Sequence, residues 1–413
     1  MKLPKLFLIG LFCGLIFKLY AQEKDQYVIL VSLDGYRYDY TERFQPANLS
    51  KFIESGVNAE SLIPTFPSKT FPSHYSIATG MRSGKHGLIN NTFYDPDRKQ
   101  VYKNSNPESS QDGVWYGGKP LWVLAEENGL KTASYFFIGS EAEIMGYRPS
   151  YYYNYDRNVP NMERIAKVLD WLALPDSQRP RFISLYFSDM DDIGHIYGPD
   201  NDDQIKDAIF RLDAELGVLF NAVKQTGLDV NILIVSDHGM MSVNEDHLLD
   251  LERALEGLPI KYANNGSVVH VYLDNGIGKS KIRKKIRNSI THINMVEPRS
   301  KKYYGDSGNN NPKLGDFMII PDLGYYLVEK SGFIKYDKRS TMYGTKTFGE
   351  HGFHPKFKEM HGIFYANGPA IKSAYNIGSF ENIHIYPLIC EILNLPIPDY
   401  IDGDLSVLQE IIE

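Results

Sequence analysis

The chain has 413 residues, of which 43% are hydrophobic and 23% are charged, an ordinary globular composition with enough apolar material for a large core. Its formal net charge of −7 argues against a general binder of nucleic-acid polymers, because such binding needs many phosphate contacts from Lys and Arg. The two cysteines, Cys13 and Cys390, cannot form a disulfide framework, so stability must come from packing and from any bound metal.

The first 21 residues have the pattern of an export signal. Two lysines give a positive start, residues 6–17 form an apolar run of signal length, and Ala21 supplies a small residue near a cleavage point. Lys18 interrupts the run, which argues against a stable membrane span. The sequence therefore predicts an exported protein, periplasmic or extracellular, in which residues 22–413 form a single domain with surface excursions.

Residues 27–33 form a continuous apolar run that predicts a buried parallel strand ending in Asp34. A proline-rich segment, 64–74, follows, and its three prolines exclude a regular helix or a central strand. We expect a helix to begin at Tyr75. Thr70 then lies at a stiffened junction, which suits a nucleophile whose oxygen must be held in place. A surface turn is the other interpretation of this segment.

Two further segments are interpreted from composition and periodicity. Residues 100–118 are polar and rich in Ser, Asn and Gly, which predicts a long surface loop before a helix that runs through Asn128. Residues 278–293 place isoleucines on one face with basic residues around them. This pattern predicts an amphipathic helix that covers a sheet and exposes its basic side to solvent.

Two more apolar runs, 181–187 and 231–236, predict buried strands, and each is followed by acidic residues. The apolar residues between them recur with a helical period over 202–224. Alternating strands and helices predict an α/β fold with a mostly parallel sheet. Because ligands bind beyond the carboxyl ends of the strands in such sheets, we expect the strand-end acids to converge on one edge.

Six Asp and His residues in this chain have the character of metal ligands: Asp34, Asp191, His195, Asp237, His238 and His351. Mixed Asp and His sets suit zinc, and six ligands make two sites of three. Two neighbouring cations suit in-line phosphoryl displacement, because they stabilise the entering and the leaving oxygen. Asp189 and Asp192 are alternatives to Asp191, although its four-residue spacing from His195 favours Asp191.

The proline-rich segment resembles the active-site segment of the nucleotide pyrophosphatase/phosphodiesterase family, which belongs to the alkaline phosphatase superfamily. The match runs over residues 66–76 with Thr79 and Gly80, and the resemblance spans 26–400 in unbroken order. Further matching segments are 86–91, 94–96, 120–122, 139–141, 191–199, 236–240 and 349–353.

The resemblance implies an alkaline-phosphatase-like fold, with a central, mostly parallel sheet flanked by helices on both faces. It also implies a two-zinc hydrolase that cleaves nucleotide phosphodiester and pyrophosphate bonds through a phospho-threonine intermediate and releases nucleoside 5′-monophosphates. The expected partner is a small nucleotide rather than a nucleic-acid polymer. Relatives that cleave glycerophosphodiesters or choline phospholipids share the metal core, so they remain an alternative.

The resemblance also implies roles for individual residues. Thr70 would be the nucleophile and a metal contact, and Asn91 would donate its amide to a phosphoryl oxygen. One zinc ion would be held by Asp34, Asp237 and His238, and the other by Asp191, His195 and His351. The residues expected to bind substrate are Lys69, Phe71, Asn91, Trp122 and Tyr152, where Phe71 and Tyr152 would stack on the base. Tyr151 and Tyr153 remain alternatives to Tyr152.

Overall fold

The computed structural model describes residues 25–274, 276–298, 301–305 and 311–413. The predicted export segment, 1–21, lies outside the described residues. Among the described residues, no helix combines the length and the apolar character needed to cross a membrane.

An eight-stranded sheet forms the centre of the molecule, with its strands in the order β19-β2-β18-β9-β1-β8-β6-β7. The central strand β1 pairs in parallel with both β8 and β9, whereas β18 is antiparallel to its two neighbours. The predicted α/β fold with a mostly parallel sheet is therefore confirmed. The strands are β19 (Tyr375–Ile377), β2 (Val57–Ala59), β18 (Phe364–Asn367), β9 (Val230–Val235), β1 (Tyr27–Leu33), β8 (Phe182–Phe187), β6 (Thr132–Tyr135) and β7 (Tyr151–Tyr153).

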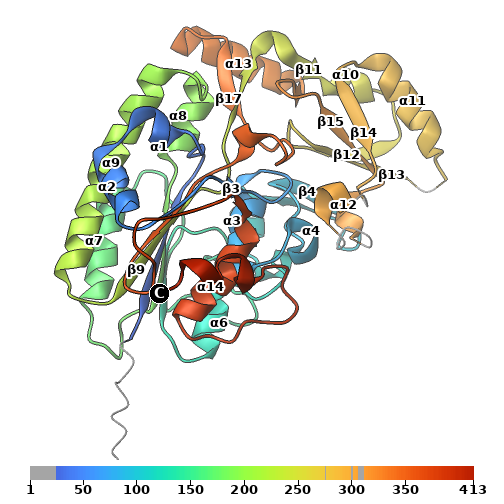
Figure 1. Ribbon diagram of the computed structural model, residues 1–413. Coiled ribbons are helices and arrows are strands. Elements are labelled where there is room, and N and C mark those ends of the chain that lie inside the picture. Colours follow the sequence, from blue (N-terminus) through green and yellow to red (C-terminus); the bar gives the residue numbers. More distant parts are fainter. Residues whose placement is uncertain (1–24, 275, 299–300, 306–310) are drawn as a thin grey trace, which may run out of the picture.

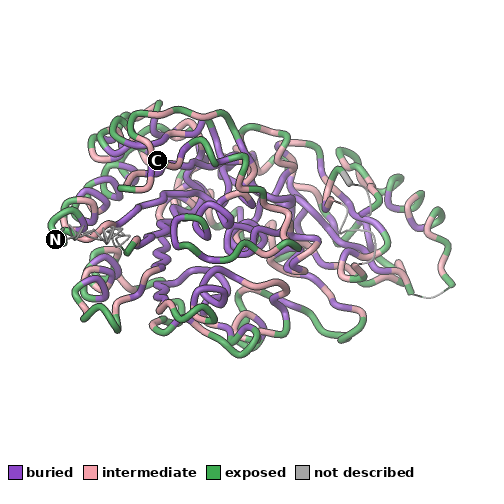
Figure 2. The backbone as a smooth tube through the Cα atoms, turned by 60° about the horizontal axis from the view of Figure 1, so that its bottom comes forward, coloured by how far each residue is buried: buried purple, intermediate pink, exposed green. Residues whose placement is uncertain are grey.

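Side chains of β1 alternate between two hydrophobic cores, as the two-residue period of a strand requires. Ile29 and Val31 belong to the core beneath helices α2 (Ala47–Glu54), α7 (Asn161–Leu172) and α9 (Asp202–Gln225). Val28 and Leu30 belong to the opposite core, beneath α3 (Thr70–Thr79), α6 (Leu121–Glu127) and α14 (Ile385–Ile392). Helices thus cover both faces of the sheet (Figure 1), and the buried backbone runs through the middle of the molecule (Figure 2).

A second, four-stranded antiparallel sheet forms a lobe beside the main body (Figure 1). Its strands, in spatial order, are β12 (Ile260–Asn264), β13 (Val269–Leu273), β15 (Phe317–Pro321) and β14 (Ile293–Val296). Helix α11 (Lys279–Ser289) packs on it through Ile282 and Ile286, as predicted for an amphipathic helix, but it ends before residue 293, because Ile290 is extended and Ile293 begins β14. The lobe has its own core, and helix α13 (Lys330–Tyr343) follows it in the chain.

Candidate active site

Three acids gather at the carboxyl edge of the main sheet, as predicted from the ends of the strands. Asp34 follows β1, Asp237 follows β9, and Asp191 lies in the first turn of helix α8 (Asp189–Tyr197), which follows β8. The three strands are adjacent and parallel, so their carboxyl ends share one edge. The backbone N–H of Asp191 donates to the carbonyl oxygen of Asp34 at 3.0 Å, which ties two of these strand ends together.

Three histidines complete the cluster. His195 projects from α8, His238 follows Asp237, and His351 follows strand β17 (Thr347–Glu350). In each ring Nδ1 lies at 2.8–2.9 Å from a backbone carbonyl oxygen. The three pairs are His195 with Gly349, His238 with Gly239, and His351 with Ser68. A carbonyl oxygen can only accept, so Nδ1 must carry the proton. The lone pair on Nε2 is then free to face a metal ion.

The Nε2 atoms of these histidines face the carboxylates. His238 Nε2 lies 3.0 Å from Asp237 Oδ2 and 3.4 Å from Asp34 Oδ1. Asp191 Oδ1 lies 3.3 Å from His195 Nε2 and 3.7 Å from His351 Nε2. All six predicted ligands therefore lie in one cluster, in which the rings of His238 and His351 stack with their centroids 3.6 Å apart. The groups whose donor atoms all lie within 4.8 Å of one another are composed differently from the predicted sets: Asp191 with His238 and His351, and Asp34 with His74 and Asp237.

Three carboxylate oxygens in this cluster are buried without a hydrogen-bond partner among the described residues: Asp34 Oδ1, Asp191 Oδ1 and Asp237 Oδ2. Burial, with the nearby charges of Asp237 and Asp191, raises the pKa of Asp34 well above its usual value. Such uncompensated carboxylates are costly unless a cation neutralises them. Burial lowers the pKa of His351 well below its usual value, which keeps its imidazole neutral. The donor atoms therefore fit metal ions, and Asp and His together suit zinc.

Thr70 is the first residue of α3, and its Oγ1 lies 3.3 Å from His238 Nε2. The expectation that this helix begins at Tyr75 is wrong, because the helix begins at Thr70 and includes Pro72 in its first turn. A proline is tolerated there, since the first N–H groups of a helix have no intrahelical acceptor. The N–H of Phe71 donates to Asn91 Oδ1 at 3.1 Å. This hydrogen bond orients the Asn91 amide and leaves its NH₂ group available to a ligand.

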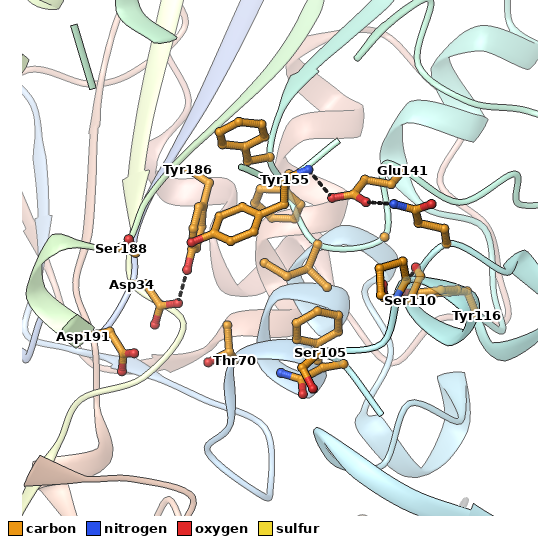
Figure 3. Close-up of a pocket in the computed structure, with 18 of the residues that line it drawn as sticks. Asp34, Thr70, Ser105, Ser110, Tyr116, Glu141, Tyr155, Tyr186, Ser188 and Asp191 are labelled. Atoms are coloured by element: carbon orange, nitrogen blue, oxygen red, sulfur yellow. Dashed lines mark hydrogen bonds between the residues drawn. The ribbon is translucent and has the colours of Figure 1, made fainter. Parts of the chain in front are cut away.

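A cleft of about 480 Å³ opens beside Thr70, and we call it the aromatic cleft (Figure 3). Its aromatic lining is Phe71, Tyr116, Phe136, Phe137, Tyr155 and Tyr186. Glu141 also lines it, where Oε1 accepts the N–H of Tyr155 at 2.7 Å and Oε2 accepts Gln111 Nε2 at 2.8 Å. The cleft therefore combines π-faces with a carboxylate that can accept further hydrogen bonds.

Of the residues predicted to bind substrate, only Phe71 lines this cleft. Lys69 and Asn91 line a second cleft, described below, and Tyr152 and Trp122 line neither. Tyr152 is on the edge strand β7, 38% exposed, with its ring 5.8 Å from the Arg148 guanidinium. Tyr155, three residues further on, lines the cleft instead (Figure 3). Trp122 is 1% exposed in α6, where it packs against Phe137 as part of the core.

Residues 100–118, predicted as a surface loop, instead form one wall of the aromatic cleft. They contain β5 (Gln100–Lys103), helix α5 (Pro107–Ser110) and a 3₁₀ turn, η1 (Gly113–Trp115). Strand β5 pairs with β4 (Thr92–Asp95) as an antiparallel hairpin. The turn residues 96–99, between two short strands, were the feature of the sequence that could have predicted this hairpin. The lining residues from this segment are Asn104, Ser105, Pro107, Ser110, Gln111 and Tyr116.

A second cleft, of about 490 Å³, adjoins the predicted ligands His195 and His351, and we call it the polar cleft. Asn104 lines both clefts, and Lys69 and Asn91 line the polar one. The other wall comes from the end of β12, from strand β16 (Tyr326–Val328) and from the start of α13, and includes Asn264, Asn265, Tyr326, Glu329 and Lys335.

Lys69, the residue before Thr70, is buried at the base of the polar cleft. Its Nζ donates to the Tyr326 hydroxyl at 3.3 Å and lies 3.9 Å from Glu350 Oε2. Burial lowers the pKa of Lys69, and the negative charge of Glu350 opposes that shift. The amine of Lys69 is therefore held between Tyr326 and Glu350 in the polar cleft.

Comparisons with known proteins agree with this arrangement. The sequence pattern of the family described as "Type I phosphodiesterase / nucleotide pyrophosphatase" matches residues 28–354. A venom phosphodiesterase from Crotalus durissus collilineatus is 31% identical over 401 residues, which are 94% of this chain and 46% of that protein. An uncharacterized pyrophosphatase/phosphodiesterase from Schizosaccharomyces pombe is 32% identical over 383 residues, which are 89% of this chain and 77% of that protein.

Family member 1 of the human ectonucleotide pyrophosphatases/phosphodiesterases is 32% identical over 397 residues, 90% of this chain and 40% of that protein. The chain thus spans about half the length or less of the human and venom relatives. Murine ectonucleotide pyrophosphatase/phosphodiesterase 5, solved as an inactive form with AMP, has the same fold, with a TM-score of 0.84 and 24% identity. That likeness covers 94% of this chain and all of the murine chain.

The fold and the site define an alkaline-phosphatase-like α/β protein with an Asp/His centre able to bind metal. Within that class, the chain belongs to the type I phosphodiesterase/nucleotide pyrophosphatase family.

Proposed function

We propose that the chain is a two-zinc nucleotide pyrophosphatase/phosphodiesterase that releases nucleoside 5′-monophosphates through a phospho-threonine intermediate. The position of Thr70 carries this proposal. Its Oγ1 lies 3.3 Å from His238 Nε2, and it lines the aromatic cleft while the preceding Lys69 lines the polar cleft. A phosphoryl group beside Thr70 would have room for a nucleoside on one side and for a leaving group on the other.

In this proposal Asp34, Asp237 and His238 would hold one zinc ion, and Asp191, His195 and His351 the other. When bound, the two ions would supply the positive charge that stabilises the entering and leaving oxygens of an in-line displacement. The start of α3 holds Thr70 in place, and the positive end of the helix dipole favours a developing negative charge there. The Asn91 amide would donate to a phosphoryl oxygen.

The clefts support a nucleotide as the substrate. We assign the base to the aromatic cleft, against Phe71 and Tyr155, with Tyr155 in place of the predicted Tyr152. Glu141 could accept a hydrogen bond from an exocyclic amine of the base. Lys69 and Lys335 line the polar cleft, where a pyrophosphate leaving group would depart. A glycerophosphodiester without choline would leave these aromatic faces without a partner, whereas a choline headgroup could contact them by cation–π attraction, so glycerophosphocholine is the alternative substrate to test.

The names of the relatives support two further parts of the proposal. The venom and ectonucleotide enzymes are named for work outside the cell, which agrees with the predicted export of this chain. The murine structure contains AMP, the kind of nucleotide that the aromatic cleft would hold. We therefore propose an exported enzyme that acts on small nucleotides.

A substrate panel with metal analysis on the same purified sample tests this function. We expect turnover of ATP and p-nitrophenyl thymidine 5′-monophosphate, with little on glycerophosphocholine, and two zinc equivalents per chain. Thr70→Ala should abolish turnover while the zinc content stays within one equivalent of the wild type. Faster turnover of glycerophosphocholine than of any nucleotide would reject the nucleotide assignment, and well under two zinc equivalents in active enzyme would reject the two-metal assignment.

A further inference from the structure

We propose that His74 is a positioning residue that fixes Asp237 relative to the start of α3, and that it does not itself bind a metal ion. The inference rests on the proposed metal-dependent function, and it concerns a side chain for which neither the sequence pattern nor the two clefts suggest a role. His74 lies one turn after Thr70 in α3 and is fully buried.

Both ring nitrogens of His74 are already engaged. Its Nδ1 lies 2.9 Å from the carbonyl oxygen of Thr70 and 3.3 Å from Asp237 Oδ2. The carbonyl oxygen can only accept, so Nδ1 carries the proton and donates to Thr70, while Asp237 Oδ2 lies close to the same N–H without a hydrogen bond. Its Nε2 lies 2.7 Å from the Ser32 hydroxyl, which can donate to that nitrogen. One imidazole thus joins β1, the first turn of α3 and a carboxylate of the metal cluster.

The bonding of the ring argues against His74 as a metal ligand, although its position alone would allow it. A donor atom of His74 lies within 4.8 Å of those of Asp34 and Asp237. A ligand nitrogen needs a free lone pair directed at the ion. In His74, Nδ1 carries the proton, and the lone pair of Nε2 faces Ser32. In His238, by contrast, only Nδ1 is used by the backbone, and Nε2 faces Asp237.

The contacts of His74 explain how it would act on the site. Asp237 Oδ1 accepts the N–H of Gly35 at 3.2 Å, whereas Oδ2 accepts no hydrogen bond among the described residues and lies 3.3 Å from His74 Nδ1. In this proposal the attraction between the His74 N–H and Oδ2 is the second influence on the orientation of this carboxylate. The same N–H contacts the carbonyl of Thr70, and therefore couples the proposed ligand to the proposed nucleophile. The ring also packs edge-on against Tyr186, at 5.5 Å between centroids, and the Tyr186 hydroxyl donates to Asp34 Oδ2 at 2.6 Å.

Two substitutions distinguish the role of Nδ1 from that of Nε2. In His74→Asn the amide NH₂ can occupy the place of Nδ1 and donate to Asp237, whereas in His74→Gln the longer amide reaches toward Ser32. Outer groups that orient metal ligands typically contribute about 10- to 100-fold in metal affinity or activity. We expect His74→Gln to lower kcat on p-nitrophenyl thymidine 5′-monophosphate by about 10- to 100-fold with little change in KM. We expect His74→Asn to keep most of the wild-type kcat.

Zinc affinity, measured by competition with a chelating dye, gives a readout that needs no substrate. At saturating zinc both variants should bind as many equivalents as the wild type, and His74→Gln should bind one of them about 10- to 100-fold more weakly than His74→Asn does. The matched control is His86→Asn. His86 is also buried, lies 3.0 Å from the hydroxyl of Ser76 in the same helix, and packs on Tyr75. This control should lower thermal stability and leave kcat and zinc affinity unchanged.

Loss of one zinc equivalent at saturating zinc in both His74 variants would show that His74 is a ligand and would overturn the proposal. Equal effects of His74→Asn and His74→Gln on zinc affinity would also overturn it, because the Nδ1 donor would then have no specific role. A wild-type protein that binds zinc but turns over no nucleotide would reject the proposed function instead. The affinity order of the variants would still decide the role of His74.

Discussion

Replacing Tyr155 by Leu tests the assignment of the base to the aromatic cleft. Stacking of a base on an aromatic side chain contributes about 1–3 kcal/mol. Tyr155 is 48% exposed, so part of its ring remains in water, and we expect a value near the lower end of this range. Since 1.4 kcal/mol corresponds to a factor of ten, kcat/KM on p-nitrophenyl thymidine 5′-monophosphate should fall by about 5- to 20-fold.

The assay compares that substrate with methyl p-nitrophenyl phosphate, which has the same leaving group and no base. Tyr155→Leu should change turnover of the base-free substrate by less than about twofold, because stacking is absent from that reaction. Tyr152→Leu is the matched control, since Tyr152 is exposed to a similar extent but lies outside the cleft lining. An equal loss on both substrates, or an equal loss in the Tyr152 variant, would refute the assignment.

Three further predictions concern the rest of the site and the lobe. Asn91→Ala should lower kcat by about 10²- to 10³-fold in steady-state assays, because the Asn91 amide is proposed to stabilise the transition state. An unchanged kcat would contradict that role of Asn91. Lys335→Gln should lower kcat/KM for ATP by about 2- to 5-fold and leave p-nitrophenyl thymidine 5′-monophosphate unaffected. An exposed charge contributes modestly, and only ATP carries charged phosphates in its leaving group before reaction, whereas the p-nitrophenyl group of the other substrate is neutral. Equal effects on both substrates would contradict this prediction. Burial lowers the pKa of His270 from 6.5 to about 4, so the unfolded chain takes up a proton there first as the pH falls. Its contribution to stability is full above pH 6.5 and is lost toward pH 4. The free energy of unfolding of the zinc-free protein, measured with urea, should therefore fall between pH 8 and pH 5 by about 2 kcal/mol less in His270→Gln than in the wild type. An identical fall in both proteins would contradict the burial of a neutral His270.

The main sheet could be predicted from the sequence because each of its central strands is a continuous apolar run. Strand β1 begins and ends at the predicted residues, and Asp34 and Asp237 follow their strands at the expected edge. Parallel pairing alone brings these acids together. Two of the histidines were predicted as ligands because they lie within four residues of a strand-end acid, and His351 was predicted from its segment, 349–353, before the family resemblance implied which set it joins.

The clefts could not be predicted in the same way, because their walls are assembled from tertiary contacts. Three consecutive tyrosines on β7 gave no reason to choose Tyr155, which lies beyond the strand and points into the cleft (Figure 3). Trp122 lies in a segment that matches the family, but its helix turns the indole into the core. The composition of 100–118 indicated a loop, yet antiparallel pairing with β4 turns this polar segment into a wall.

The most direct test of the account is to trap the intermediate. Wild-type enzyme mixed with ATP labelled at the α-phosphate is quenched in acid within milliseconds, and the labelled peptide is identified by mass spectrometry. We predict one nucleotidyl group attached to Thr70 Oγ1, formed before free nucleoside monophosphate appears and absent from Thr70→Ala. Active enzyme that never carries label on Thr70, or label that persists in Thr70→Ala, would contradict the central claim that this threonine is the nucleophile.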